Sequence, residues 1–220
     1  MNHVRFGQLR RVEPISRHWG WDRGKPVDRH YIERFLAAHA ADIKGRVLEV
    51  GDNRYTLAFG GARVTKSEVV QASEGNPNAD YVADFVHAPQ LPSATFDCII
   101  CAQTLQFISD LPAAIATLYR ILKPEGVLLV TVPGISQIDL DKNDRWKDYW
   151  RFTGHAANWL FRQVFPADLV TVRTYGNVLA AIAFLHGLAA EELTDKELDH
   201  HDELYPMIVG VRAQKPSEAK

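Results

Sequence analysis

Acidic side chains lie in and after the first two predicted strands, and these residues are the best placed to hold a charged ligand. The apolar run RVLEV (46–50) is typical of a buried strand, and Gly51 and Asp52 follow it directly. Glu49 lies within the run, and Glu68 comes 17 residues after Gly51, near the predicted end of the next strand. Carboxylates attract cations and accept hydrogen bonds from hydroxyl groups. We therefore expect a ligand that carries positive charge and hydroxyl groups.

A dinucleotide fits this loop poorly. A pyrophosphate site needs G-x-G-x-x-G, because the phosphates must approach bare backbone at a helix N-terminus. Only Gly51 is present here, since Asp52, Asn53 and Tyr55 occupy the following positions and Gly60 comes too late. S-adenosylmethionine fits better, because it has no phosphate and carries a sulfonium, an ammonium and a ribose diol.

The ribose and the adenine of that cofactor each have a candidate contact. Glu68 is the expected ribose-binding acid at the end of the second strand, at close to the usual spacing. Asp84 and Phe85, at the end of the third predicted strand, offer a hydrogen-bonding side chain and an apolar surface for adenine.

Strands and helices alternate along the chain, which predicts an α/β fold with helices on both faces of a mostly parallel, doubly wound sheet. Tyr205-Pro206 before the last strand indicates that this strand is antiparallel. Four helices are predicted. The first begins near Asp28, a candidate cap; the second and third cover 111–122 and 155–164; the fourth is an Ala-rich segment before the last strand. The predicted strands are 46–50, 62–69, 80–85, 96–102, 126–134, about 169–174, and 207–213.

Composition excludes several functions. The chain of 220 residues corresponds to one domain with additions, at about 150 residues per domain. Its net charge of −2 gives no basic excess for nucleic acid or an anionic membrane. The longest nearly apolar stretch, 178–190, is too short to span a bilayer, so we expect a cytoplasmic protein. Cys98 and Cys101 would face opposite sides of a strand, which predicts core cysteines rather than a disulfide.

Several stretches resemble class I S-adenosylmethionine-dependent methyltransferases of the type-11 kind. They are VLEVG, the acidic Glu68, VADFVHAPQLPSATFDCIICAQTLQFI and AAIATLYRILKPEGVLLVTVPG, and DYWRFTG (148–154) is similar to an element that follows the fifth strand in many bacterial members. More narrowly, HWGWDRGKPVDRHYIERFL, GDNRYT and YGNVLAAIAFLHGLAAEELT resemble the mycobacterial sugar O-methyltransferases of methylmannose polysaccharide biosynthesis.

This resemblance implies a Rossmann-like, seven-stranded fold and a division of the chain. Residues 1–27 would form an N-terminal lid and substrate segment, 28–215 the methyltransferase domain with a lid at about 135–153, and 216–220 a flexible tail. The cofactor residues expected from the resemblance and from the residue types together are Glu49, Gly51, Asp52, Tyr55, Glu68, Asp84, Phe85, Gln103 and Arg29. Two departures matter: the G-x-G-x-G loop is reduced to Gly51, and Gln106 and Phe107 replace histidines that many relatives carry.

Aromatic residues cluster in two segments that lack helix or strand periodicity, and these should flank the cleft. Aromatic faces interleaved with charged groups match the C–H faces and hydroxyls of a sugar; packing of the loops onto the domain is the alternative. The expected substrate residues are Trp21, Asp28, Tyr31, Tyr149, Trp150 and Arg151. Asp144 or His155 is the expected base that removes the acceptor proton.

These observations predict an O-methyltransferase for a small saccharide. The alternatives are a methyltransferase for another small metabolite, or an inactive cofactor-binding domain that partners a glycosyltransferase. A homodimer is possible on this sequence, and no nucleic acid or membrane partner is expected. His200 and His201 would face opposite ways on an extended segment, so no metal is expected there.

Overall fold

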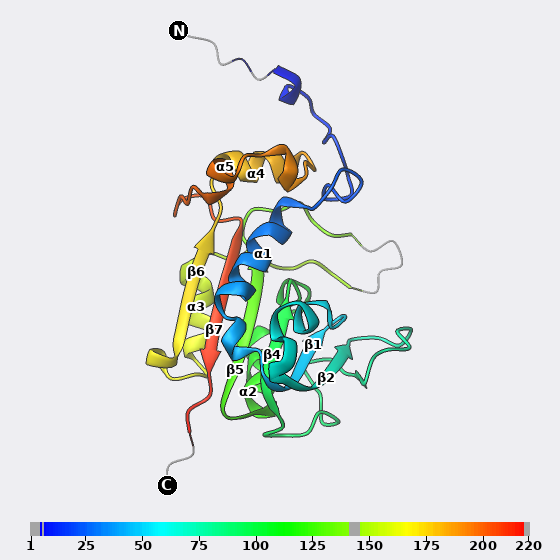
Figure 1. The fold of residues 1–220 in the computed structure, drawn as a ribbon, viewed down its shortest axis with the longest axis vertical. Coiled ribbons are helices and arrows are strands. Elements are labelled where there is room, and N and C mark those ends of the chain that lie inside the picture. The colour runs from blue at the N-terminus through cyan, green and yellow to red at the C-terminus, as the bar shows by residue number, and fades with distance from the viewer. Residues whose placement is uncertain (1–4, 6, 141–145, 218–220) are drawn as a thin grey trace.

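A seven-stranded sheet forms the centre of the computed structural model, which describes residue 5 and residues 7–140 and 146–217 (Figure 1). The strand order is β3-β2-β1-β4-β5-β7-β6. β7 is antiparallel to both of its neighbours, and the other adjacent pairs are parallel. The predicted α/β fold is confirmed. The strands are β1 Gly45–Val50, β2 Val64–Gln71, β3 Tyr81–Val82, β4 Phe96–Ala102, β5 Leu122–Pro133, β6 Val170–Tyr175 and β7 Ile208–Gln214.

Helices cover both faces of the sheet, as predicted. α1 (Val27–Ala38) and α4 (Val178–Leu185) contribute to one core layer, while α2 (Leu111–Ile121) and α3 (Gly154–Arg162) contribute to the other. In Figure 1, α1 lies in front of the sheet and α2 behind it. The two cysteines are free and buried in β4, with Cys98 in the α1 layer and Cys101 in the α2 layer. Their placement in opposite layers confirms that the C-x-x-C spacing is a core feature of a strand.

Several details of the elements differ from the sequence prediction, including the start of β5 at Leu122 rather than at residue 126. β2 ends at Gln71 rather than at residue 69, and β3 is shorter because Asp84 accepts a hydrogen bond from the Val86 amide in a turn. Asp28 does not cap α1, because Pro26 holds the N-cap position and Asp28 lies in the first turn. The short helix α5 (Asp195–Asp199) was missed, although Thr194 and Glu197 form a capping box at its start.

The strand order reverses between β1 and β4, and in open α/β sheets the ligand binds beyond the carboxyl ends of the strands at such a point. The segment before α1 is fixed over this edge through the chain that follows α4. The Ile15 and Ser16 amides donate to the His186 carbonyl, and Pro26 pairs with Ala189. In the described residues, no helix has both the length and the apolar character needed to cross a membrane.

Candidate active site

Two adjoining cavities lie beyond the carboxyl ends of the strands, and they share the walls made by Gln103, Phe107 and Asp139. The larger one, about 650 Å³, lies at the ends of β1, β2 and β4 and in the loop after β3. This volume is in the range of small-molecule sites. The smaller one, about 230 Å³, lies between the segment before α1 and the segment after β5.

At Gly51 a ligand in the larger cavity can come close to the backbone, and hydrogen-bond donors lie beside this glycine. Gly51 has φ +92°, which favours glycine, and a Cβ there would meet no atom within 4 Å. Its carbonyl accepts hydrogen bonds from Gln71 Nε2 at 2.7 Å and Asn76 Nδ2 at 3.2 Å. Asp84 and the buried Phe85 line the same cavity. This set suits a ligand with a flat apolar ring, hydroxyl groups and no phosphate.

Glu68 does not lie at this cavity, and here the structure corrects the sequence prediction. Because β2 extends to Gln71, Glu68 is inside the strand, where its buried carboxylate binds Arg46, Lys66 and Tyr81. The two cations hold the pKa of Glu68 below its ordinary value despite burial. Gln71 occupies the strand end where Glu68 was expected.

Glu49 also faces away from both cavities, contrary to expectation. Its carboxylate accepts hydrogen bonds from the Tyr55 amide (3.1 Å), the Thr56 amide (2.7 Å) and the Thr56 hydroxyl (2.7 Å). It therefore ties the helical segment after β1 to the strand. Burial raises the pKa of Glu49 to about 7, against the lowering effect of these three donors.

The other two loop residues named as cofactor contacts do not line either cavity. Asp52 pairs with Arg54 at 2.6 Å. The buried Tyr55 accepts a hydrogen bond from Arg29 at 2.9 Å and so helps to fix the position of the Arg29 guanidinium.

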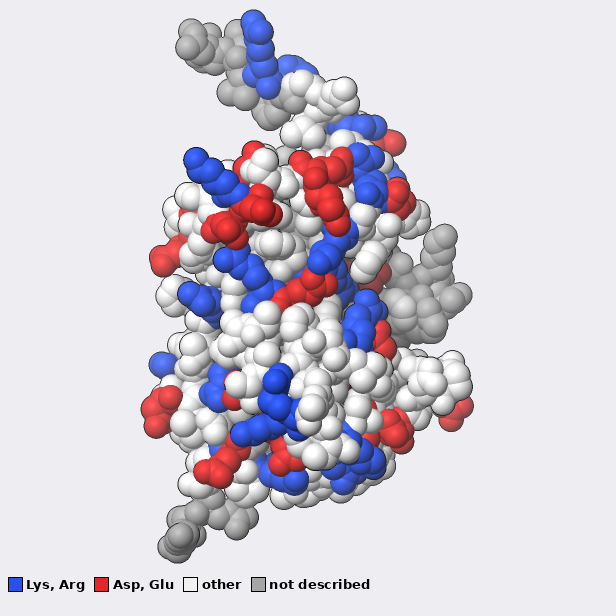
Figure 2. Space-filling model, in the orientation of Figure 1, with Lys and Arg blue, Asp and Glu red and all other residues white. Residues whose placement is uncertain are grey.

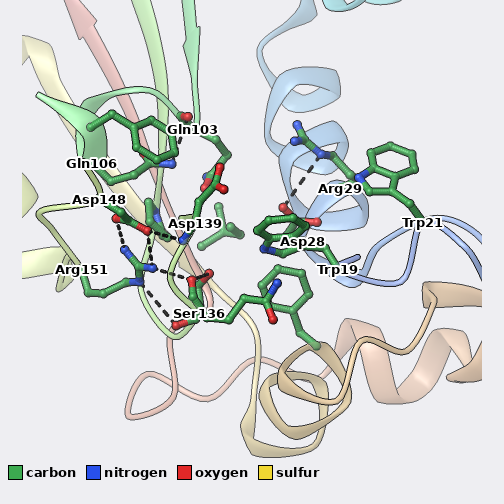
Figure 3. A pocket seen from close by; sticks show the side chains of 15 residues that line it. Trp19, Trp21, Asp28, Arg29, Gln103, Gln106, Ser136, Asp139, Asp148 and Arg151 are labelled. Carbon is green, nitrogen blue, oxygen red and sulfur yellow. Dashed lines mark hydrogen bonds and ion pairs between the residues drawn. The ribbon is translucent and has the colours of Figure 1, made fainter. Parts of the chain in front are cut away.

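The smaller cavity brings together residues that lie far apart in the sequence (Figure 3). Trp19, Trp21, Asp28 and Arg29 line one side, and the guanidinium of Arg29 lies 5.9 Å from the ring centre of Trp21. The opposite side carries polar groups from the end of β4 and from the segment after β5, namely Gln103, Gln106, Ser136, Gln137, Asp139, Asp148 and Arg151.

The wall after β5 is held in place by its own hydrogen bonds. Arg151 forms two hydrogen bonds with Asp148, at 2.6 and 2.8 Å, and the second oxygen of Asp148 also accepts from the Asp139 amide. The Tyr149 amide donates to the Gln106 carbonyl at 2.8 Å. These hydrogen bonds connect the described parts of this wall, on either side of residues 141–145, to each other and to the segment after β4.

Three buried polar atoms at the smaller cavity lack a hydrogen-bond partner. They are Asp28 Oδ1, Arg29 Nε and Gln106 Oε1, and the described part of the chain has only five such atoms. Buried polar groups are normally paired, because an unpaired one costs about 1–3 kcal/mol. Their concentration beside this cavity makes it the best candidate for a polar-ligand site among the described residues.

Several predicted site residues lie elsewhere. Tyr31 is a core residue whose hydroxyl donates to the Leu198 carbonyl, and His155 is exposed in the first turn of α3, away from both cavities. Trp150 lines neither cavity and donates to the Ile108 carbonyl at 2.9 Å. Tyr149 lines the larger cavity rather than the smaller one. Asp144 falls outside the described residues.

The histidine pair near the last strand makes no cluster in the structure. His201 Nε2 is 2.9 Å from the Thr174 hydroxyl. Within residues 7–140 and 146–217, no three His, Cys, Asp or Glu side chains are grouped to hold a metal ion.

Sequence reasoning missed Gln71 and Gln106, which line the larger and the smaller cavity respectively. Gln71 could have been found by extending the predicted second strand through the apolar pair Val69–Val70, because both valines are buried strand residues and Gln71 follows them directly. Gln106 was noted only as a replacement for histidine, and nothing in its sequence context shows that its side-chain oxygen is buried and unpartnered.

Comparison with known proteins points to one family. The profile of a family described as "Methyltransferase domain" matches residues 23–170. Among curated proteins, the ubiquinone/menaquinone biosynthesis C-methyltransferase UbiE of Enterobacter sp. (strain 638) is 35% identical over 86 residues, covering 39% of this chain and 32% of that protein. UbiE of Escherichia coli (strain K12 / DH10B) is 33% identical over 86 residues, with the same coverage. The chain thus spans about a third of the length of these relatives.

Solved structures share the fold at low sequence identity. An S-adenosylmethionine-dependent methyltransferase from Mesorhizobium loti has a TM-score of 0.56 and 18% identity, covering 86% of this chain and 100% of that one. The [4+2]-cyclase SpnF has a TM-score of 0.56 and 18% identity, covering 89% and 85%. Phosphoethanolamine N-methyltransferase 2 of Haemonchus contortus, in complex with S-adenosyl-L-methionine, has a TM-score of 0.56 and 15% identity, covering 96% and 55%.

Proposed function

The chain belongs to the family described as a methyltransferase domain, and from this premise we propose that it uses S-adenosylmethionine to methylate a hydroxyl group of a small saccharide. The cofactor supplies an electrophilic methyl group on a positively charged sulfur. The protein must hold that group in line with the acceptor oxygen, since alignment is the main contribution it can make to such a transfer.

The larger cavity has the residues that would hold this cofactor. Asp84 and Phe85 would contact adenine, while Gln71, beside Gly51, would contact the ribose. Gln103 borders both cavities and marks the point where cofactor and acceptor would meet. Arg29 Nε makes no hydrogen bond in the described residues, and its guanidinium would bind the cofactor's carboxylate from the adjoining cavity.

The smaller cavity would hold the acceptor, and its unpartnered polar atoms carry this proposal. Asp28 Oδ1 and Gln106 Oε1 need hydrogen-bond donors, and hydroxyl groups supply them. Trp19 and Trp21 add aromatic surface against which the C–H face of a sugar ring can pack. A wholly apolar acceptor would leave the buried oxygens without partners.

A small acceptor also agrees with the charge distribution. Lysine, arginine, aspartate and glutamate are interspersed over the face shown in Figure 2, without a broad basic field. A nucleic-acid substrate would require such a field to neutralise its phosphates.

A methyl-transfer screen tests the acceptor class. The purified chain is incubated with S-adenosylmethionine and either methyl glycosides or phenolic quinone precursors, and S-adenosylhomocysteine and product mass are measured. We expect turnover with a glycoside and a new O–CH₃ signal in the product NMR spectrum. Turnover confined to the phenolic acceptors, with a new C–CH₃ bond, would overturn the saccharide proposal.

A further inference from the structure

The smaller cavity contains one carboxylate that is buried and incompletely bonded, and we infer that this residue, Asp28, binds the acceptor hydroxyl and removes its proton. This assignment rests on the proposed function, because it needs a hydroxyl acceptor. Of the two bases that the sequence favoured, His155 lines neither cavity and Asp144 falls outside the described residues.

Asp28 lies in the first turn of α1 and is 8% exposed. Its Oδ1 has no hydrogen-bond partner in the described residues, and its Oδ2 lies 3.9 Å from Arg29 Nε. Figure 3 shows Asp28 and Asp139 on opposite sides of the same cavity. Asp28 lines this cavity, so a hydroxyl group bound there would lie beside its carboxylate, and Oδ1 is the oxygen of that carboxylate that makes no hydrogen bond in the described residues.

The other acidic and basic groups near the cavity are less suited to this role. Both oxygens of Asp148 are bound by Arg151, and one also accepts from the Asp139 amide, so a proton transfer there would disrupt the wall. His155 lines neither cavity. Asp139 borders both cavities and is therefore the residue against which Asp28 must be tested.

The surroundings of Asp28 raise its affinity for a proton above that of an ordinary aspartate. Burial raises its pKa, and Glu33 on the next turn acts in the same direction, while Arg29 acts against them. Across the cavity, Asp139 and the Asp148–Arg151 pair face it. A carboxylate with a raised pKa accepts a proton more readily than an ordinary aspartate and remains deprotonated above that pKa.

The proposed step balances in atoms and charge. The acceptor oxygen forms a bond to the methyl carbon as the carbon–sulfur bond breaks, and sulfur retains the electron pair of that bond. The hydroxyl proton passes to Asp28 Oδ1. The products are the methyl ether, neutral-sulfur S-adenosylhomocysteine and protonated Asp28, which then releases its proton to water.

The test is the variant Asp28→Asn, which keeps the shape of the side chain. Loss of a general base lowers kcat by about 10²- to 10⁴-fold, and we expect a decrease of this size with the methyl glycoside that the wild type uses best. S-adenosylhomocysteine affinity should stay within about threefold, which shows that the variant is folded. In the wild type, log kcat should rise with pH through the pKa of Asp28, and this rise should be absent from the variant.

Matched variants separate the possible results. Glu33→Gln removes a neighbouring carboxylate outside both cavities, and His155→Ala removes the alternative base; neither should abolish the rise of kcat with pH. If Asp28→Asn retains wild-type kcat, or if Asp139→Asn alone abolishes the rise, the assignment of Asp28 is wrong while the saccharide proposal stands. If the wild type binds S-adenosylhomocysteine but methylates no glycoside, both proposals fail.

Discussion

Buried carboxylates differ sharply between the β1–β2 half of the sheet and the smaller cavity. Glu49 accepts three hydrogen bonds from its own chain, and Glu68 binds Arg46, Lys66 and Tyr81. Asp28, which is also buried, leaves one oxygen without a partner in the described residues. The first two therefore stabilise the fold, while the third is available to a ligand.

This difference shows why the type of a residue and its approximate position in the chain did not identify the carboxylates that are available to a ligand. Glu49 and Glu68 were predicted to contact the cofactor because acidic residues at strand ends often do so. Their contacts show that the chain itself uses both carboxylates. The polar groups that line the two cavities are instead amides at strand ends, such as Gln71, and residues near α1 such as Asp28 and Arg29.

The largest effect on stability is expected from the pH dependence of Glu49. A pKa raised from 4.5 to about 7 means that the folded state binds this proton more tightly than the unfolded chain, which corresponds to about 3 kcal/mol. This contribution is complete below pH 4.5 and is lost as the pH rises to 7. Urea unfolding of the wild type and Glu49→Gln across this range should show the wild type losing about 3 kcal/mol relative to the variant. Parallel profiles would contradict this account.

Replacement of Glu68 should destabilise the fold by a smaller amount. Glu68→Gln removes the charge that Arg46 and Lys66 bind, and hydrogen bonds between charged groups contribute about 1.5–3 kcal/mol, so we expect a loss of about 2 kcal/mol in urea unfolding at pH 7. The exposed Glu74 provides the control, because Glu74→Gln should change stability by less than about 0.5 kcal/mol. Equal stability of the two variants would show that the Glu68 ion pairs contribute little.

The tryptophans provide a comparison within the acceptor region. Trp21→Ala removes a wall of the smaller cavity and should raise the acceptor KM, while S-adenosylhomocysteine affinity stays within about threefold, or 0.65 kcal/mol. Trp150→Ala is the matched control, because Trp150 lines neither cavity and should leave both quantities nearly unchanged. A larger KM effect at Trp150 than at Trp21 would place the acceptor elsewhere.

The sequence predicted the sheet well because hydrophobic periodicity and turn residues act locally. The sequence alone predicts all seven strands, the antiparallel β7 and the core position of Cys98 and Cys101. The site was predicted less well, because a difference of two residues at the end of β2 replaces Glu68 with Gln71. Trp21 and Asp28 come to line the same cavity as Asp148 and Arg151 through long-range packing, which the local sequence pattern does not encode.

The central claim is that the larger cavity holds the cofactor with Gln71, not Glu68, at the strand end. Titration calorimetry with S-adenosylhomocysteine on the wild type, Gln71→Ala and Glu68→Gln tests it most directly. We predict micromolar binding to the wild type, about tenfold weaker binding to Gln71→Ala, which is about 1.4 kcal/mol, and unchanged affinity for folded Glu68→Gln. No binding to the wild type at millimolar ligand, or a loss of binding in Glu68→Gln with none in Gln71→Ala, would contradict the claim.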